Sequence, residues 1–221
     1  MLKLEKGTKV NVGELMSRLL QGRITKVDFR LPYEESQVID MLTASYMAEV
    51  KYRNREFSEN PELTKQIAKA ARWLTTQEKF GIMLCGVPGN GKTTLMLAIR
   101  SLINFIEMTD SYNEKMSVCR IDAREIARLN KDDYAKFERI RSKKMLAIDD
   151  MGLEPAEVMD YGNILNPVID LLSYRYDEQL FTIVTTNLKP EEIRQKYGDR
   201  IADRFNEMME RIIFYNSSYR G

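Results

Sequence analysis

The chain of 221 residues contains no histidine and only two cysteines, Cys85 and Cys119. The lack of histidine excludes catalytic triads and metal sites that depend on an imidazole, so any catalysis must use carboxylates, asparagine, lysine and arginine. Both cysteines lie in apolar runs that predict core strands, where a thiol behaves as a small apolar side chain rather than as half of a disulfide. We therefore expect the protein to work in a reducing cytoplasm.

Long apolar segments and a charge excess of one sign are also missing. No run of about 18 apolar residues occurs, and the N-terminus carries no apolar stretch of the kind found in signal peptides. We therefore expect no membrane segment and a cytoplasmic location. The 34 basic and 33 acidic residues leave a net charge of +1, so contact with DNA would need a local basic groove rather than a global polycation.

The most informative motif spans residues 86–93, Gly-Val-Pro-Gly-Asn-Gly-Lys-Thr. It fits the pattern of a phosphate-binding loop, with a short apolar strand predicted over residues 80–85 before it and an amphipathic helix after it. Glycines let the backbone wrap around a phosphate, Lys92 supplies a positive point charge, and the hydroxyl of Thr93 is a ligand for Mg²⁺. The motif therefore predicts a nucleotide site. The residues expected to contact the nucleotide are Gly86, Val87, Pro88, Gly89, Asn90, Gly91, Lys92, Thr93 and Thr94.

Polar side chains follow two further predicted strands. The apolar run 145–148 ends in Asp149 and Asp150, and the run 181–185 is followed closely by Asn187. Ligands of open parallel sheets bind at the carboxyl ends of the strands, so we expect these residues to face the same phosphates. Asp149 is expected to serve the metal together with Thr93, and Asp150 to polarise the attacking water. Asn187 is expected to orient that water or to touch the γ-phosphate.

Strands and helices alternate along the chain, which predicts an α/β fold with a parallel sheet and helices on both faces. Strands are expected at 80–85, 117–121, 145–148 and 181–185, with a last apolar run at 212–215. Helices are expected at 61–73, after Lys92, at 122–129, within 130–144, and at 164–176, 191–196 and 199–208.

The first 56 residues carry no phosphate chemistry. Apolar residues at near-helical spacing predict a helix over 34–50, and a second helix is expected at 13–21. We place a boundary near Phe57, which gives a small helical N-terminal segment, residues 1–56, and a nucleotide-binding core, residues 57–221. The N-terminal segment is either a packing arm or a unit that docks a partner, and the sequence favours neither.

The phosphate-binding loop and several further motifs together resemble one protein family. The loop, the Asp-Asp-Met-Gly box at 149–152 and Thr-Asn-Leu at 186–188 resemble the AAA+ ATPases of the DnaC/IstB group, which are bacterial replicative-helicase loaders and transposition helper ATPases. Residues 197–204 resemble that group's Gly-Glu-Arg-x-x-x-Arg box. Residues 213–220 resemble the loaders' ending of Ile-Phe, three variable residues and Ser-Tyr-Arg. The resemblance runs from about residue 57 to residue 220.

The resemblance implies a P-loop NTPase core of the AAA+ type that binds ATP and Mg²⁺ at the interfaces of a homo-oligomer. It implies that Arg204 is an arginine finger for a neighbouring subunit, that Arg220 is the sensor-two arginine, and that Arg200 is a further nucleotide or interface contact. A finger contributes roughly 10³ to 10⁵ in rate where it is used. The leading interpretation is an ATP-dependent loader that assembles on single-stranded DNA and delivers or opens a hexameric DnaB-type helicase.

Two features depart from the AAA+ pattern. Asp150 stands where many AAA+ enzymes have glutamate, and a side chain shorter by one methylene predicts slow turnover, which suits a switch. Because the given sequence ends at Gly221, we also expect no long C-terminal helical lid of the kind that most AAA+ proteins have.

Three other functions stay open. The closest is an IstB-like transposition helper that binds duplex DNA and activates a transposase, because it would share the ATPase core. A small-molecule P-loop kinase would need an acceptor pocket and a mobile lid, and it would not need Arg204 to act between subunits. A scaffold that binds ATP without hydrolysing it is compatible with Asp150 in place of glutamate.

Candidate DNA contacts form two basic groups, for which a solvated charged face is the favoured interpretation. Single-strand binding through them would weaken steeply with salt. The first group is Arg124, Arg128 and Lys131, and the second is Arg139, Arg141, Lys143 and Lys144.

Overall fold

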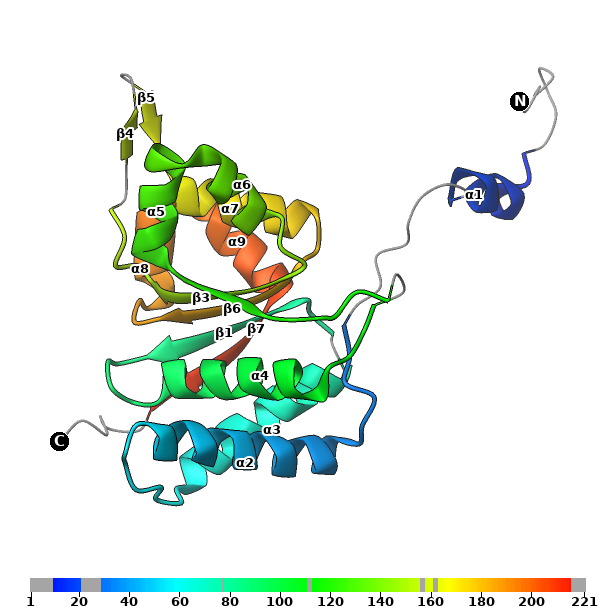
Figure 1. The fold of residues 1–221 in the computed structure, drawn as a ribbon. Helices are drawn as coiled ribbons and strands as arrows, with labels where there is room; N and C mark the ends of the chain where they lie inside the picture. The colour runs from blue at the N-terminus through cyan, green and yellow to red at the C-terminus, as the bar shows by residue number, and fades with distance from the viewer. Residues whose placement is uncertain are drawn as a thin grey trace.

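Five parallel strands form one sheet, in the order β2-β3-β6-β1-β7, in the computed structural model of the chain (Figure 1). The structure describes residues 10–20, 29–76, 78–110, 113–155, 158–160 and 163–215. The sheet and the helices around it confirm the predicted α/β fold. The strands are β1 (Gly81–Gly86), β2 (Cys119–Asp122), β3 (Met145–Met151), β6 (Phe181–Thr186) and β7 (Met209–Phe214).

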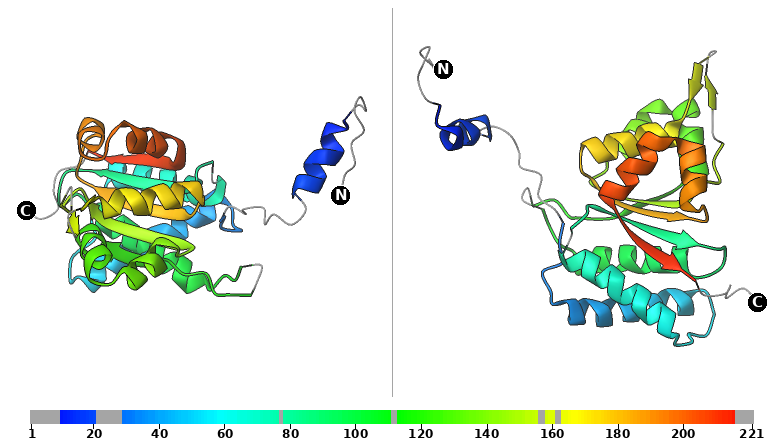
Figure 2. Two further views of the ribbon diagram at one scale, coloured as in Figure 1. Left: turned by 90° about the horizontal axis from the view of Figure 1, so that it is seen from above. Right: turned by 180° about the vertical axis from the view of Figure 1, so that it is seen from behind.

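Helices cover both faces of this sheet because the strands are apolar on both faces. Successive apolar side chains along a strand point to opposite sides of the sheet. On β1, Ile82 and Leu84 belong to one buried cluster and Met83 to the other. The first cluster lies under α2 (Glu35–Tyr52), α3 (Pro61–Thr76) and α4 (Lys92–Ile106), as the view from behind in Figure 2 shows. The opposite face carries α5 (Ala123–Asp132), α6 (Tyr134–Arg141), α7 (Pro167–Asp177), α8 (Pro190–Tyr197) and α9 (Asp199–Met208).

The segment before α7 differs from the prediction. Residues from 164 were expected to be helical, but 163–165 form β5 (Asn163–Leu165), which pairs with β4 (Val158–Asp160) in a separate antiparallel ribbon. The helix begins at Pro167 because the side chain of Asn166 accepts a hydrogen bond from the backbone N–H of Ile169 and the proline fixes the first helical φ. The sequence pattern missed the hairpin because strands of three residues each are too short to give a periodic pattern.

The last strand brings the C-terminal part of the chain beside the P-loop strand. β7 pairs with β1 in parallel and begins at Met209, three residues before the predicted apolar run. At the end of this pair, a Cβ added to Gly86 would lie 2.6 Å from the backbone oxygen of Phe214. The first residue of the P-loop must therefore be glycine for β7 to lie this close.

Helix α2 packs into the same buried cluster as α3 and α4. Val38 and Leu42 are fully buried, and the hydroxyl of Ser45 donates to the carbonyl of Ala98 on α4 at 2.8 Å. A second bond joins the two helices, because the hydroxyl of Ser101 donates to the Glu49 carboxylate at 2.7 Å. The predicted boundary near residue 57 stays a prediction, but α2 on its N-terminal side is an integral layer of the core.

Helix α1 (Val12–Leu20) differs from α2 in having no buried residue. Its apolar side chains Val12, Met16 and Leu19 are exposed, and the helix lies apart from the sheet and its flanking helices (Figure 1). Among the residues that the structure describes, no helix has the length and apolar character needed to cross a membrane.

Candidate nucleotide-binding site

A cleft of about 740 Å³ lies at the carboxyl ends of β1, β3 and β6. Its lining includes residues 88–93 of the P-loop, Asp149 and Asp150 near the end of β3, and Asn187 directly after β6. The structure thus brings together residues predicted from three separate strand ends. Arg53, Arg55, Arg120 and Leu153 also line this cleft, although no motif of the sequence marks them.

The P-loop backbone depends on glycine at two positions. Gly89 has a φ of 83° and Gly91 a φ of 101°, both in the left-handed region that side chains with a Cβ rarely adopt. Gly91 is also the N-cap of α4, so the loop leads directly into the helix N-terminus. A helix start presents backbone N–H groups and a partial positive charge, which favour a phosphate.

Lys92 is buried, and its ammonium group is held by the P-loop. Its Nζ donates to the carbonyls of Gly86 at 2.6 Å and Val87 at 2.7 Å, and to the side-chain oxygen of Asn90 at 3.1 Å. The side-chain nitrogen of Asn90 in turn donates to the backbone oxygen of Phe214 at 3.1 Å. Asn90 therefore connects the P-loop lysine to the end of β7, a link that the loop pattern alone could not predict.

Asp149 connects the P-loop to two other strands. Its Oδ1 accepts from the hydroxyls of Thr93 at 3.0 Å and Thr185 at 2.6 Å, and its Oδ2 pairs with a guanidinium nitrogen of Arg120 at 2.6 Å. The carboxylate is almost fully buried, whereas 43% of the Arg120 side chain is exposed. A hydroxyl beside a carboxylate gives the oxygen ligands that Mg²⁺ prefers, so Thr93 and Asp149 fit the predicted metal role.

Arg120 was missed because its partner lies on another strand. It sits on β2 two residues before Asp122, so both side chains are on the same face of the strand. β2 pairs in register with β3, with Asp122 opposite Asp149. Strand alternation combined with the parallel order could have placed Arg120 near the predicted metal carboxylate.

Asp150 has an unusual backbone conformation. Its φ of 54° lies in the left-handed region, and the pairing of β3 with β6 shifts register between Ile148 and Met151. The backbone N–H of Asp150 donates to the Thr185 hydroxyl at 2.9 Å, which fixes this turn. Burial raises the pKa of the Asp150 carboxyl, and the nearby carboxylate of Asp149 raises it further. A raised pKa makes the group a better proton acceptor, as expected for a residue that activates water.

Asn187 faces the same cleft with an unsatisfied acceptor. Its side-chain oxygen is buried and has no hydrogen-bond partner among the described residues. Buried polar atoms are usually paired, so an unpaired amide beside a P-loop fits a group that meets water or phosphate. Its role in catalysis stays a prediction.

The three predicted arginines lie elsewhere or outside the described residues. Arg204 is absent from the lining of this cleft; its guanidinium pairs with Asp177 at 3.1 Å and stacks over the ring of Tyr176 at 4.6 Å. Arg200 is exposed on α9. Arg220 falls within the C-terminal residues that the structure does not describe. The chain therefore does not bring Arg204 to its own cleft.

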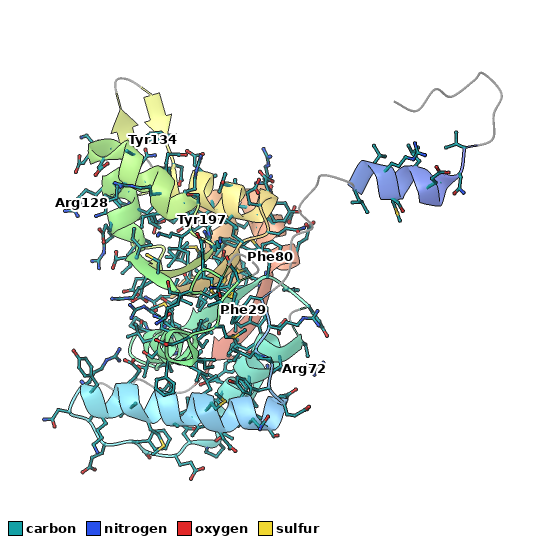
Figure 3. All side chains as sticks on the ribbon, turned by 45° about the vertical axis from the view of Figure 1, so that its right-hand side comes forward. Phe29, Arg72, Phe80, Arg128, Tyr134 and Tyr197 are labelled. Atoms are coloured by element: carbon teal, nitrogen blue, oxygen red, sulfur yellow. The ribbon has the colours of Figure 1, made fainter. Side chains whose placement is uncertain are left out.

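The basic groups considered for DNA contact have acidic neighbours. The guanidinium of Arg124 donates twice to the Asp122 carboxylate, at 2.9 and 2.8 Å, and that of Arg128, at the outer edge of the molecule (Figure 3), lies 3.9 Å from a carboxylate oxygen of Glu125. In the second group, Lys144 pairs with Asp110 and Glu114. These ion pairs favour a solvated charged face, and contact with DNA stays a prediction.

Comparison with known proteins gives one family. The family model described as "IstB-like ATP binding protein" matches residues 8–220. No curated protein sequence matches the chain. Among solved structures, the DnaC helicase loader is 20% identical with a TM-score of 0.56, over 72% of this chain and 93% of that one. DnaI is 22% identical with a TM-score of 0.56, over 79% and 93%. At these identities, the two structures support the fold alone.

Proposed function

The chain belongs to the family of IstB-like ATP-binding proteins, and from this premise we propose that it is an ATP-dependent loader of a hexameric DnaB-type helicase. One observation carries the proposal that the chain hydrolyses ATP. The Thr93 hydroxyl and the Asp149 carboxylate meet at 3.0 Å in the cleft that Asp150 and Asn187 also line. This is the set of groups that a nucleoside triphosphatase needs.

Each group has a part in the proposed reaction. Lys92 would contact the phosphates, and Thr93 and Asp149 would hold Mg²⁺, which when bound offsets the charge of the β- and γ-phosphates. Asp150 would orient the attacking water and accept its proton, and the amide of Asn187 would fix that water. The shorter side chain of Asp150 supports slow turnover, as a switch requires.

Hydrolysis between subunits is the second part of the proposal. Arg204 would act as a finger on the ATP of a neighbouring subunit, with Arg200 and Arg220 as further contacts. The position of Arg204 away from its own cleft supports this assignment, since a finger that acts in trans has no place there. The active form would then be a homo-oligomer with ATP at its interfaces.

The partners follow from the same interpretation. Residues 1–56 would dock the helicase, and the exposed apolar side chains of α1, Val12, Met16 and Leu19, support a docking role. Residues 57–221, with α2 packed against them, would form the ATPase core, and single-stranded DNA would bind the assembled subunits in the cytoplasm. DnaC, a structural neighbour of the chain, is itself named a helicase loader.

A transposition helper is the second candidate. The description of the matching family as IstB-like favours it. Such a protein would keep the same ATP site but would bind duplex DNA and activate a transposase. The two functions therefore differ in partner and not in chemistry.

The experiment that tests the proposal uses the Asp150→Asn protein as bait in a pull-down from the native host with ATP and Mg²⁺. This variant should bind ATP without turnover and so preserve the ATP-state complex, whereas a matched Lys92→Ala bait should bind neither ATP nor partner. Recovery of a replicative helicase with the first bait alone supports the loader. Recovery of a transposase supports the second candidate, and wild-type protein that neither binds nor hydrolyses ATP contradicts both.

A further inference from the structure

We infer that Arg53 and Arg55, which directly follow α2, form a second cationic contact to the phosphates of the bound nucleotide. The inference rests on the proposed function, because it assumes that the cleft holds a nucleoside triphosphate. It adds to the site two side chains from the part of the chain that precedes the predicted core boundary. Neither residue belongs to a nucleotide-binding motif.

A turn at the C-terminal end of α2 places residues 53–55 beside the cleft. The backbone N–H of Arg53 donates to the carbonyl of Val50 at 3.2 Å, and that of Arg55 donates to the same carbonyl at 3.3 Å. Asn54 between them has a φ of 54°, which closes the turn. Both arginines line the cleft together with the P-loop, and Figure 1 shows the C-terminal end of α2 on the same side of the molecule as the loop between β1 and α4.

Arg53 touches the P-loop helix directly. Its Nη1 donates to the hydroxyl of Thr94 at 2.7 Å, and Thr94 is buried in the first turn of α4, next to Thr93. A guanidinium carries five donor hydrogens in a planar fork, and the bond to a single hydroxyl uses one of them. The fork suits bidentate contact with phosphate oxygens, which makes arginine a common phosphate ligand.

The charge of the cleft also supports a phosphate contact by Arg53 and Arg55. Its described lining holds four cations, Arg53, Arg55, Lys92 and Arg120, against the two carboxylates of Asp149 and Asp150. Without the two arginines after α2, the cations and carboxylates would be equal in number. The excess of positive charge that attracts a polyphosphate therefore comes from these two residues.

The two side chains are carried by a firmly packed element. The bonds from Ser45 to Ala98 and from Ser101 to Glu49 hold α2 against α4, so the turn after α2 has a fixed position relative to the P-loop. Preorganised cations lose little conformational freedom when a ligand binds. A phosphate contact here would also link the bound nucleotide to α2.

The experiment measures the affinity of the full chain for ATP and for ADP, each with Mg²⁺, by calorimetry. Arg53→Gln and Arg55→Gln should each weaken ATP binding roughly tenfold or more, the effect of losing a hydrogen bond to a charged group. Arg53→Lys keeps the charge but not the fork and should lose less. The matched control is Arg72→Gln on α3, whose side chain is largely exposed and ion-paired only at 4.0 Å (Figure 3); it should bind as the wild type does.

Thermal unfolding of the nucleotide-free proteins separates a ligand contact from a structural one. If Arg53 only fastens α2 to α4, Arg53→Gln lowers the melting temperature but leaves the affinity unchanged, which overturns the inference. Wild-type affinity in both glutamine variants also overturns it. If Arg53→Gln does not fold, Arg55→Gln and Arg53→Lys still test the phosphate contact. Wild-type protein that binds no nucleotide contradicts the proposed function instead.

Discussion

A single buried carboxylate organises the nucleotide cleft at the scale of residues. Asp149 on β3 accepts hydrogen bonds from Thr93 and Thr185 and pairs with Arg120, so three strands and one helix meet at this carboxylate. Taking a charge out of water is costly unless it is paired and hydrogen-bonded, and these three partners meet that requirement. The carboxylate is thus held in place before any nucleotide or metal arrives.

The proposed finger role of Arg204 can be tested with a single substitution. Arg204→Ala should leave ATP affinity unchanged and reduce turnover of the assembled protein by roughly 10³-fold or more, because a finger stabilises the transition state and not the bound ground state. Turnover measured at saturating ATP over a range of protein concentrations checks this, since a residue that acts in trans matters only after assembly.

The control variant changes Asp177, the residue with which Arg204 forms an ion pair within the same chain. Asp177→Asn removes the carboxylate that Arg204 contacts but keeps the arginine, so it should retain near wild-type turnover. Equal loss in both variants would mean that the pair only stabilises α7 against α9. Intact turnover in Arg204→Ala would contradict a finger role.

At the scale of elements, a buried arginine joins α7 to two strands. Arg175 is fully buried and donates to the carbonyls of Arg141 at 3.0 Å, Lys143 at 2.8 Å and Phe181 at 2.6 Å, and to the hydroxyl of Thr182 at 2.9 Å. These acceptors stand just before β3 and at the start of β6. One side chain thus holds together the starts of the strands whose far ends lead to Asp149, Asp150 and Asn187 in the cleft.

Removal of this side chain should destabilise the fold. Arg175→Met keeps much of the volume but leaves buried carbonyls without a donor, so the free energy of unfolding should fall by about 2 to 4 kcal/mol. Urea denaturation of the variant and the wild type checks the value. Arg72→Met on the exposed side of α3 should change it by less than about 0.5 kcal/mol. A loss at position 175 as small as at position 72 would contradict the structural role.

The sequence predicts the positions of helices and strands better than it predicts contacts between side chains that are far apart in the chain. The bounds of α9, 199–208, agree with its pattern, and the strand ends that carry Asp149 and Asn187 followed from the rule for parallel sheets. The hairpin of β4 and β5 was missed because short strands give little periodic pattern. Arg53 was missed for a different reason, since its partner Thr94 is 41 residues away and only the packing of α2 on α4 brings them together.

At the scale of the whole molecule, the N-terminal segment has two unlike parts. α1 buries no residue, whereas α2 contributes Val38, Leu42 and Tyr46 to the core and leads into the arginines that line the cleft. A partner that docks on α1 would therefore bind outside the core. A partner that moves α2 would also disturb the nucleotide site.

Two shortened chains should accordingly differ in stability and in ATP binding. A chain of residues 21–221 should unfold at the same urea concentration as the full chain, because the described part of what it lacks is exposed. A chain of residues 57–221 should be destabilised and should lose ATP affinity, because it lacks the buried face of α2 together with Arg53 and Arg55. Leu42→Ala in the full chain is the matched control, since it removes one buried side chain of α2 without a cut and should cost about 2 to 5 kcal/mol. Equal stability and ATP affinity in both shortened chains would instead support a core that begins at residue 57 and folds without α2.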